Sequence, residues 1–410
     1  MRRRPVKSAL VIRHLMLWVA LAAMCQTGLA QRKNVLGTQV DFFGGAMEQQ
    51  GGAGFNFATL QKRIIPIFGV SPALRISSQG ANSQLDLTYA FMWLRSNNQS
   101  SLNVILHNAD MNFTARLSRS ARLRLAERAS SSNFSAFNVS SGAGLSSADF
   151  RYAYEPALAR RDSISSNANA GLDLDVGPAS YLTFAASSSY LRYGNIASFG
   201  GRLSNQLRFE GNLAYSRKLS GHHTWHVKYT IAQNRFTNYG NARTHSAEMG
   251  LSLTLSPTAT LALEAGPTLT QSRASNRDSL GYRASASFSK IINANRLSLH
   301  ASHSSGDSTG MGSVSDIDNA GLAFSRIFGK RTMIDANLSA FRGKGRLDNP
   351  YSTRGYYGAT SLAFMLNPHL FLICGGSYRK NEGAALLNST YGLLYLSIRF
   401  SAPGLWRGSR

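Results

Sequence analysis

A hairpin pattern that returns along most of the chain limits what this sequence can fold into. Its clearest copy spans residues 247–269, where apolar and polar residues alternate on both sides of Pro257. Successive side chains of a strand point to opposite faces, so each arm predicts a strand with one apolar and one polar face. Pro257 cannot donate a hydrogen bond to a neighbouring strand and therefore suits the turn between the arms.

The same pattern recurs between residues 83 and 400, with turns roughly 40 residues apart. The short turns are predicted near residues 119, 178, 220, 257, 293, 329 and 368. Longer polar stretches separate these hairpins and are predicted to be loops, among them 342–355 and 379–389, and 129–163 is the longest of them. The pattern predicts an all-β, antiparallel, up-and-down barrel of about 16 strands, with 14 or 18 also possible because another hairpin could lie within 55–84.

Short turns at one end of the strands and long loops at the other are typical of a transmembrane β-barrel. Lipid offers no hydrogen bonds, so every backbone group of a membrane-spanning sheet must pair across a closed wall. A water-soluble β-sandwich would show the same alternation along each strand. The asymmetry of the loops, the even number of strands and an export segment together favour the membrane barrel.

The two faces of the predicted strands differ in charge. One face is rich in Leu, Ala, Phe and Tyr and is predicted to contact lipid. The charges predicted to line the lumen on the other face are Asp86, Asp110, Arg116, Arg122, Arg124, Asp173, Asp175, Arg208, Glu210, Lys228, Glu248, Glu264, Arg283, Asp335 and Arg399. Opposite charges that face each other on adjacent strands attract. The expected pairs join Arg122 and Arg124 to Asp173 and Asp175, and Lys228 to Glu248.

The N-terminal segment predicts export. Residues 1–30 combine a basic stretch, a short apolar run and small residues before Gln31, which are the three parts of a secretory signal peptide. Removing it would leave Cys374 as the only cysteine, so no internal disulfide is expected. Part of the net charge of +24 belongs to this segment and much of the rest to turns and loops, so we expect no nucleic-acid partner.

The remaining chain divides into three segments. Residues 31–82 are rich in glycine and interrupted by Pro66, which predicts a periplasmic lead-in or a plug of the lumen. Residues 83–400 are the predicted barrel, and 401–410 form a C-terminal tail.

The last predicted strand, TYGLLYLSIRF, is apolar at alternate positions and ends in Phe400. Together with the repeated hairpins, it resembles the outer-membrane β-barrel proteins of Gram-negative bacteria, in particular an uncharacterised porin-like group. The resemblance covers about residues 84–400 and implies the cell outer membrane, its lipid and lipopolysaccharide as surroundings, and a possible homotrimer. It also implies recognition by the barrel-insertion machinery through Tyr391, Gly392, Leu394, Leu396, Ile398 and Phe400, although the tail after Phe400 departs from that pattern.

The motifs of common enzymes and metal sites do not occur in the sequence. We find no Walker loop, CxxC or HExxH, and the cluster of His222, His223 and His226 lies at a predicted turn, where its spacing says nothing about metal binding. We therefore expect no enzyme, metal or cofactor. The predicted function is passive passage of small polar solutes, with loop 129–163 narrowing the pore. The alternative is a barrel without a pore that serves adhesion, polysaccharide secretion or envelope structure.

Overall fold

The computed structural model describes residues 33–51, 63–96, 103–132, 163–193, 205–237, 240–273, 276–308, 314–329, 331–345, 352–383 and 389–403. The predicted signal peptide and residues 133–162 of the predicted loop 129–163 lie outside these ranges. The strands are β1 (Lys33–Gly51), β2 (Arg63–Gln79), β3 (Ser83–Ser96), β4 (Asn103–Arg116), β5 (Ala121–Ser132), β6 (Ser163–Gly177), β7 (Ser180–Tyr193), β8 (Gln206–Lys218), β9 (His223–Phe236), β10 (Gly240–Ser256), β11 (Ala259–Ser272), β12 (Arg277–Ile292), β13 (Asn295–Ser308), β14 (Val314–Phe328), β15 (Thr332–Gly345), β16 (Ser352–Asn367), β17 (Leu370–Gly383) and β18 (Ser389–Pro403). Among these residues, no helix has the length and apolar character needed to cross a membrane.

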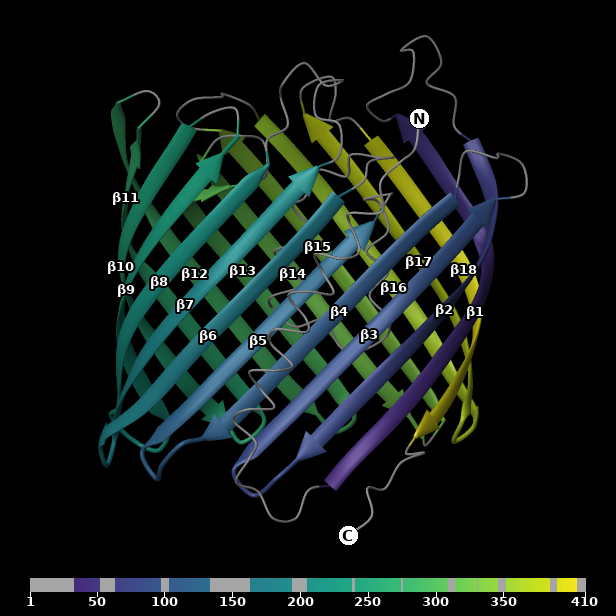
Figure 1. The fold of residues 1–410 in the computed structure, drawn as a ribbon, viewed down its shortest axis with the longest axis horizontal. Coiled ribbons are helices and arrows are strands. Elements are labelled where there is room, and N and C mark those ends of the chain that lie inside the picture. Colours follow the sequence, from purple (N-terminus) through teal and green to yellow (C-terminus); the bar gives the residue numbers. More distant parts are fainter. Residues whose placement is uncertain are drawn as a thin grey trace, which may run out of the picture.

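The strands form one closed antiparallel barrel of 18 strands (Figure 1). Each strand pairs with its neighbours in the sequence, and β1 closes the wall by pairing with β18. The closing register runs from Gly37 opposite Pro403 to Gly51 opposite Ser389. The wall therefore has no unpaired edge strand, as a sheet surrounded by lipid requires.

Short turns join the strands at one end of the barrel (Figure 1). Most connections at the other end are longer, although only three residues separate β9 from β10 and only four separate β11 from β12. All seven predicted short turns are confirmed, and residues 80–82 add one more. Four of these turns share a local bond in which a side-chain oxygen accepts from the backbone N–H two residues later, as is common for Ser and Asn in turns. The backbone donors and side-chain acceptors are Ser120 and Ser118 (3.2 Å), His222 and Ser220 (3.1 Å), Thr258 and Ser256 (3.3 Å), and His369 and Asn367 (2.8 Å).

The first two strands decide the strand number and correct the prediction for residues 31–82. The wall has 18 strands, the larger of the alternatives predicted beside about 16, because β1 and β2 lie in the segment 31–82. Both strands belong to the wall rather than to a lead-in or a plug. Glycines at 44–45 and Pro66 and Pro72 obscured the alternation there. Both prolines lie on the outward face of β2, opposite Ala46 and Val40 of β1.

The strands also extend beyond the bounds predicted at the long-loop end. Arg342 and Lys344 were placed in a loop, yet both lie in β15, and Arg379 and Lys380 lie in β17. The sequence reading followed apolar residues and therefore stopped where the outward face becomes polar. At the other end of the barrel, β18 continues to Pro403, so the first residues of the predicted tail belong to the wall.

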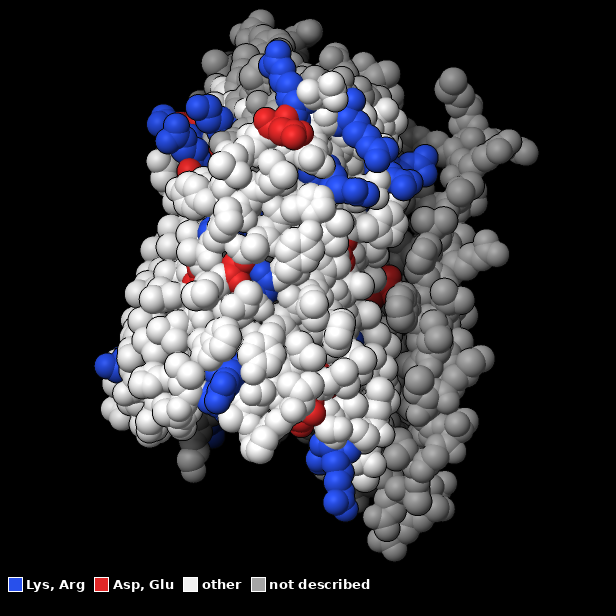
Figure 2. Space-filling model, turned by 90° about the vertical axis from the view of Figure 1, so that its left-hand side faces the viewer, with Lys and Arg blue, Asp and Glu red and all other residues white. Residues whose placement is uncertain are grey.

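The outward face carries the apolar residues in its middle. Met249 is 65% exposed and Leu394 is 70% exposed, and both alternate with side chains that point inward. Figure 2 shows one side of the wall, with most Lys and Arg side chains toward its two ends and few charges between them. Glu127 is a charged residue in the middle of β5 that lies on the outward face, and Ser166 donates a hydrogen bond to it (3.4 Å).

Candidate functional site: the inward charges of the wall

The strand register places all the predicted lumen charges on one face of the sheet. For example, Glu248 lies opposite Lys228, and the outward Met249 next to it lies opposite Val227 and Ala265. Carried from strand to strand, the same register leads from Asp86 through β4 to β12 and on to Arg399 without a change of face. This face is opposite to the exposed apolar band, so it faces the interior of the closed barrel.

The most densely paired group, which we call the inward network, lies on β9–β12. Lys228 Nζ is 3.0 Å from Glu248 Oε2 and also forms an ion pair with Glu264. Arg283 Nη1 is 3.7 Å from Glu248 Oε1, and His226 Nε2 is 3.5 Å from Glu264 Oε1. The predicted pair of Lys228 and Glu248 is confirmed, and the two carboxylates share the cation between them.

Burial makes the pairing within the inward network important for the stability of the barrel. Glu248 is only 6% exposed, and Ser246 Oγ donates a hydrogen bond to its Oε1 (2.9 Å). A carboxylate removed from water in this way is stable only when cations and hydrogen-bond donors surround it. Gly250 leaves room for the ring of His226, because a Cβ at that position would overlap the ring.

A second group lies on β4–β7 and is more exposed. Arg124 Nη2 is 2.7 Å from Asp173 Oδ1, which confirms that predicted pair, and Thr183 donates to the same carboxylate (2.8 Å). Arg128 Nε lies 2.5 Å from Asp110. Arg124 is 52% exposed, so water screens this pair and its contribution to stability is small.

Further ion pairs join four of the predicted charges to one another or to residues that were not predicted, and these four are Asp86, Arg208, Glu210 and Arg399. Arg399 forms two hydrogen bonds to Asp41, at 2.8 and 3.1 Å, across the closure of the barrel. Arg75 Nη2 lies 3.3 Å from Asp86. Asp41 and Arg75 were not predicted as lumen charges because their strands, β1 and β2, were not recognised in the sequence. Arg128 was not predicted as a lumen charge either, and it lies directly before the predicted loop 129–163. Arg208 pairs with Glu210 (2.5 Å).

Four predicted charges share the inward face without an ion pair to another described residue. They are Arg116, Arg122, Asp175 and Asp335. Arg116 instead donates to the carbonyl oxygens of Ser118 and Arg119, each at 3.2 Å, and so braces a short turn. The predicted cluster of Arg122, Arg124, Asp173 and Asp175 is therefore only partly formed, with Arg124 and Asp173 as its ion pair. Arg122 lies opposite Asp173 in the register, and Asp175 lies opposite Tyr181.

The predicted assembly signal lies in β18, which pairs with β17 and β1. Leu394, Leu396, Ile398 and Phe400 all point outward and are exposed. Gly392 lies in the same strand, and the side chain of Tyr391 lies outside the described part of the structure. The role of these residues in barrel insertion stays a prediction. Among the described residues, no cluster of three or more His, Cys, Asp or Glu side chains could hold a metal ion.

These features define the class of the protein. An even number of antiparallel strands, complete closure, an outward apolar band and loops of unequal length are the properties of a transmembrane β-barrel of the bacterial outer membrane. Residues 163–319 match a family described as "Protein of unknown function, DUF481", which covers less than half of the chain. No curated protein matches the sequence.

Three of the solved structures that are similar to this chain come from two bacteria. OpdO from Pseudomonas aeruginosa is 12% identical, and the alignment covers 91% of this chain and 98% of that chain with a TM-score of 0.45. The outer membrane protein opdK from the same species is 10% identical, with coverages of 92% and 100% and a TM-score of 0.43. The siderophore receptor PirA from Acinetobacter baumannii is 7% identical, with coverages of 90% and 80% and a TM-score of 0.46.

Proposed function

We propose that this protein is a non-enzymatic outer-membrane channel through which small polar solutes diffuse passively. The observation that carries the proposal is an 18-stranded closed wall whose inward face bears paired charges from β1 to β18. Barrels of about 16 to 18 strands are wide enough to hold an aqueous channel, whereas smaller ones are filled by side chains. Charged side chains on an inward face are stable where water reaches them.

The paired charges favour weak ion selectivity. Selective pores carry rings of side chains of one sign. Here acidic and basic residues are mixed around the wall, as in the group formed by Lys228, Glu248, Glu264 and Arg283. We therefore expect similar permeability to potassium and chloride despite the basic composition of the chain.

Planar-bilayer recording of the refolded protein tests the proposal. A water-filled lumen predicts stepwise increases in conductance and a reversal potential near zero in a potassium chloride gradient. Liposome swelling should show uptake of small sugars that declines with sugar size. A correctly folded barrel that gives neither conductance nor swelling would refute the channel and favour the barrel without a pore.

A pair of cysteine variants tests whether ions pass through the lumen of the barrel. Both carry Cys374→Ser, and one adds Ala262→Cys on the inward face while the other adds Leu263→Cys on the outward face of the same strand. A water-soluble cationic thiol reagent should change the single-channel conductance of the Ala262→Cys variant within minutes. The Leu263→Cys variant is the matched control, because its side chain faces lipid and should be unaffected.

A further inference from the structure

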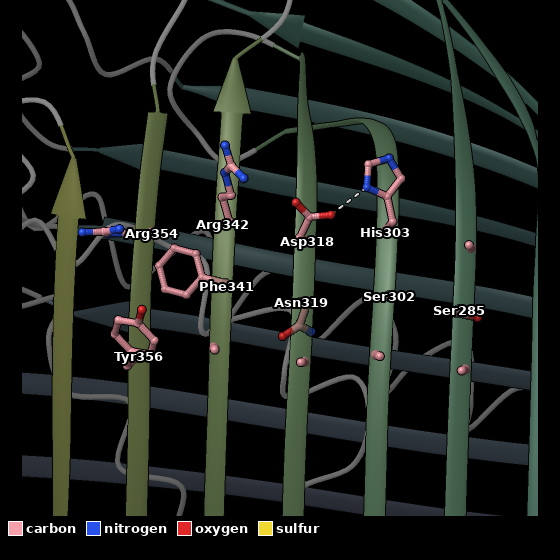
Figure 3. Close-up of a pocket in the computed structure, with 14 residues that line it drawn as sticks. Ser285, Ser302, His303, Asp318, Asn319, Phe341, Arg342, Arg354 and Tyr356 are labelled. Atoms are coloured by element: carbon pink, nitrogen blue, oxygen red, sulfur yellow. Dashed lines mark hydrogen bonds and ion pairs between the residues drawn. The ribbon is translucent and has the colours of Figure 1, made fainter.

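A groove of about 570 Å³ lies on the outward face of β12–β16 near the long-loop end. Its floor is made of small side chains, which leave the backbone of the wall close to the surface. The alanines of the floor are Ala284, Ala286, Ala301, Ala320 and Ala340. Figure 3 shows the polar side chains of its rim, with Arg342 and Arg354 on neighbouring strands above Tyr356.

The register explains how an apolar floor meets a charged rim. One row of residues that lie opposite one another on successive strands runs through Ala286, Ala301, Ala320, Ala340 and Tyr356. The next outward row toward the long loops runs through Ala284, His303, Asp318, Arg342, Arg354 and Glu382. The outward face thus changes from alanine to charge between two consecutive rows.

The rim carries more positive than negative charge that is available to a ligand. His303 Nδ1 contacts Asp318 Oδ1 at 2.7 Å, as the dashed line in Figure 3 marks, and the His303 ring stacks on Tyr282 with centroids 4.0 Å apart. Glu382 is shared by two cations, since Arg354 Nε and Lys380 Nζ both lie 2.6 Å from it. Arg342 forms no hydrogen bond or ion pair with another described residue, and it is exposed. We call His303, Asp318, Arg342, Arg354, Lys380 and Glu382 the outward charged patch.

The position of the outward charged patch indicates what it meets. Tyr282 and Tyr356 point outward at this height, and aromatic side chains of this kind suit the boundary between hydrocarbon and headgroups. Tyr356 lies one outward row below Arg354, and Tyr282 lies one outward row beyond Ala284 toward the long loops, so the two tyrosines border the charged row on either side. A guanidinium at this level faces the layer that holds lipid phosphates, and Arg binds phosphate oxygens through two parallel hydrogen bonds.

We propose that this groove binds a phosphorylated, acylated lipid of the outer leaflet. The phosphate contacts Arg342 and Arg354, while an acyl chain lies on the alanine floor. The volume is within the range of small-molecule sites, about 300 to 1,000 Å³. Charge complementarity favours a lipid over a second copy of this chain, because a copy would have to supply an anion to an unpaired arginine within an otherwise apolar contact. The proposal does not depend on an open lumen.

Binding of lipid A to the detergent-solubilised full-length protein tests the phosphate contact by native mass spectrometry. The variant Arg342→Gln/Arg354→Gln should bind lipid A about tenfold more weakly or worse, because each lost bond to a charged group contributes on the order of tenfold. The control variant Arg235→Gln/Arg243→Gln removes the same charge from exposed outward positions on β9 and β10. It should bind like the wild type. Equal binding by all three proteins would overturn the proposal.

A second variant tests the acyl chain. Ala320→Phe fills the groove without changing charge, and it should weaken lipid A binding while heat-modifiable gel mobility shows that the barrel is folded. Inorganic phosphate at millimolar concentration should not displace the lipid. If Ala320→Phe binds lipid A like the wild type, or if phosphate alone displaces it, the site recognises a free anion and the lipid proposal fails. If Ala320→Phe instead changes the oligomeric state and leaves lipid binding intact, the face is an interface between copies, and the proposal fails as well.

Discussion

The inward network and the outward charged patch hold the same kinds of side chain on opposite faces of the wall. The inward network on β9–β12 places Glu248 at the middle of its strand, where two cations and Ser246 surround it. The outward charged patch on β13–β17 lies at the long-loop ends and leaves Arg342 exposed. Inside the barrel, charge is tolerated at mid-height when it is paired. Outside, charge gathers where the strands leave the hydrocarbon.

Removing Lys228, the cation shared by two carboxylates of the inward network, should reduce the stability of the barrel more than any other change considered. Lys228→Met leaves Glu248 and Glu264 facing each other without their common partner, and an uncompensated buried charge costs about 3–5 kcal/mol. The free energy of unfolding from lipid vesicles in urea measures it. The control Lys218→Met removes an exposed cation near a short turn and should change stability by less than about 0.5 kcal/mol. Equal effects would show that lumen water, rather than pairing, supports the network.

Introducing a charge at the same height on the outward face should cause the next largest loss of stability. Met249 follows Glu248 in β10 but points to lipid, so Met249→Arg should destabilise the barrel by about 2–4 kcal/mol. The same unfolding experiment measures the change. Ser252→Arg, which places the new charge on the inward face of the same strand, serves as the control and should cost less. A larger cost for Ser252→Arg would reverse the assignment of the two faces.

The exposed pair of Arg124 and Asp173 should contribute less than either of these. A double-mutant cycle with Arg124→Gln and Asp173→Asn should give a coupling energy of about 0.2–1 kcal/mol, which falls further at high salt. Comparison with the coupling of Lys228 and Glu248, measured in the same way, tests whether burial sets the difference. A coupling for the exposed pair as large as that of the buried one would contradict this explanation.

Removing a cation from the outward charged patch should have the smallest effect on stability. Arg342 has no partner among the described residues, so Arg342→Met should change the free energy of unfolding by no more than about 0.5 kcal/mol. Its effect should be on lipid binding instead. A loss of stability above about 1 kcal/mol in lipid-free detergent would mean that Arg342 supports the wall itself, as a lost hydrogen bond would.

Local alternation was enough to predict most of the barrel. It predicted the short turns and assigned the charged residues to one face, because both depend on residues close together in the sequence. It did not find β1 and β2, since glycine and proline weaken an alternating pattern. It also ended the strands β15 and β17 too early, because a polar outward face at the top of a strand looks like a loop when only apolar residues are followed.

The sequence by itself determined β3 to β18, their two faces and therefore the membrane environment, because side chains of a strand alternate with a period of two. Only the tertiary structure decided how many strands close the wall, that Arg399 meets Asp41, and that Lys228 serves two carboxylates. Only the tertiary structure assembled the outward charged patch from β13–β17. These features depend on the register between strands, and that register is set by contacts between residues far apart in the chain.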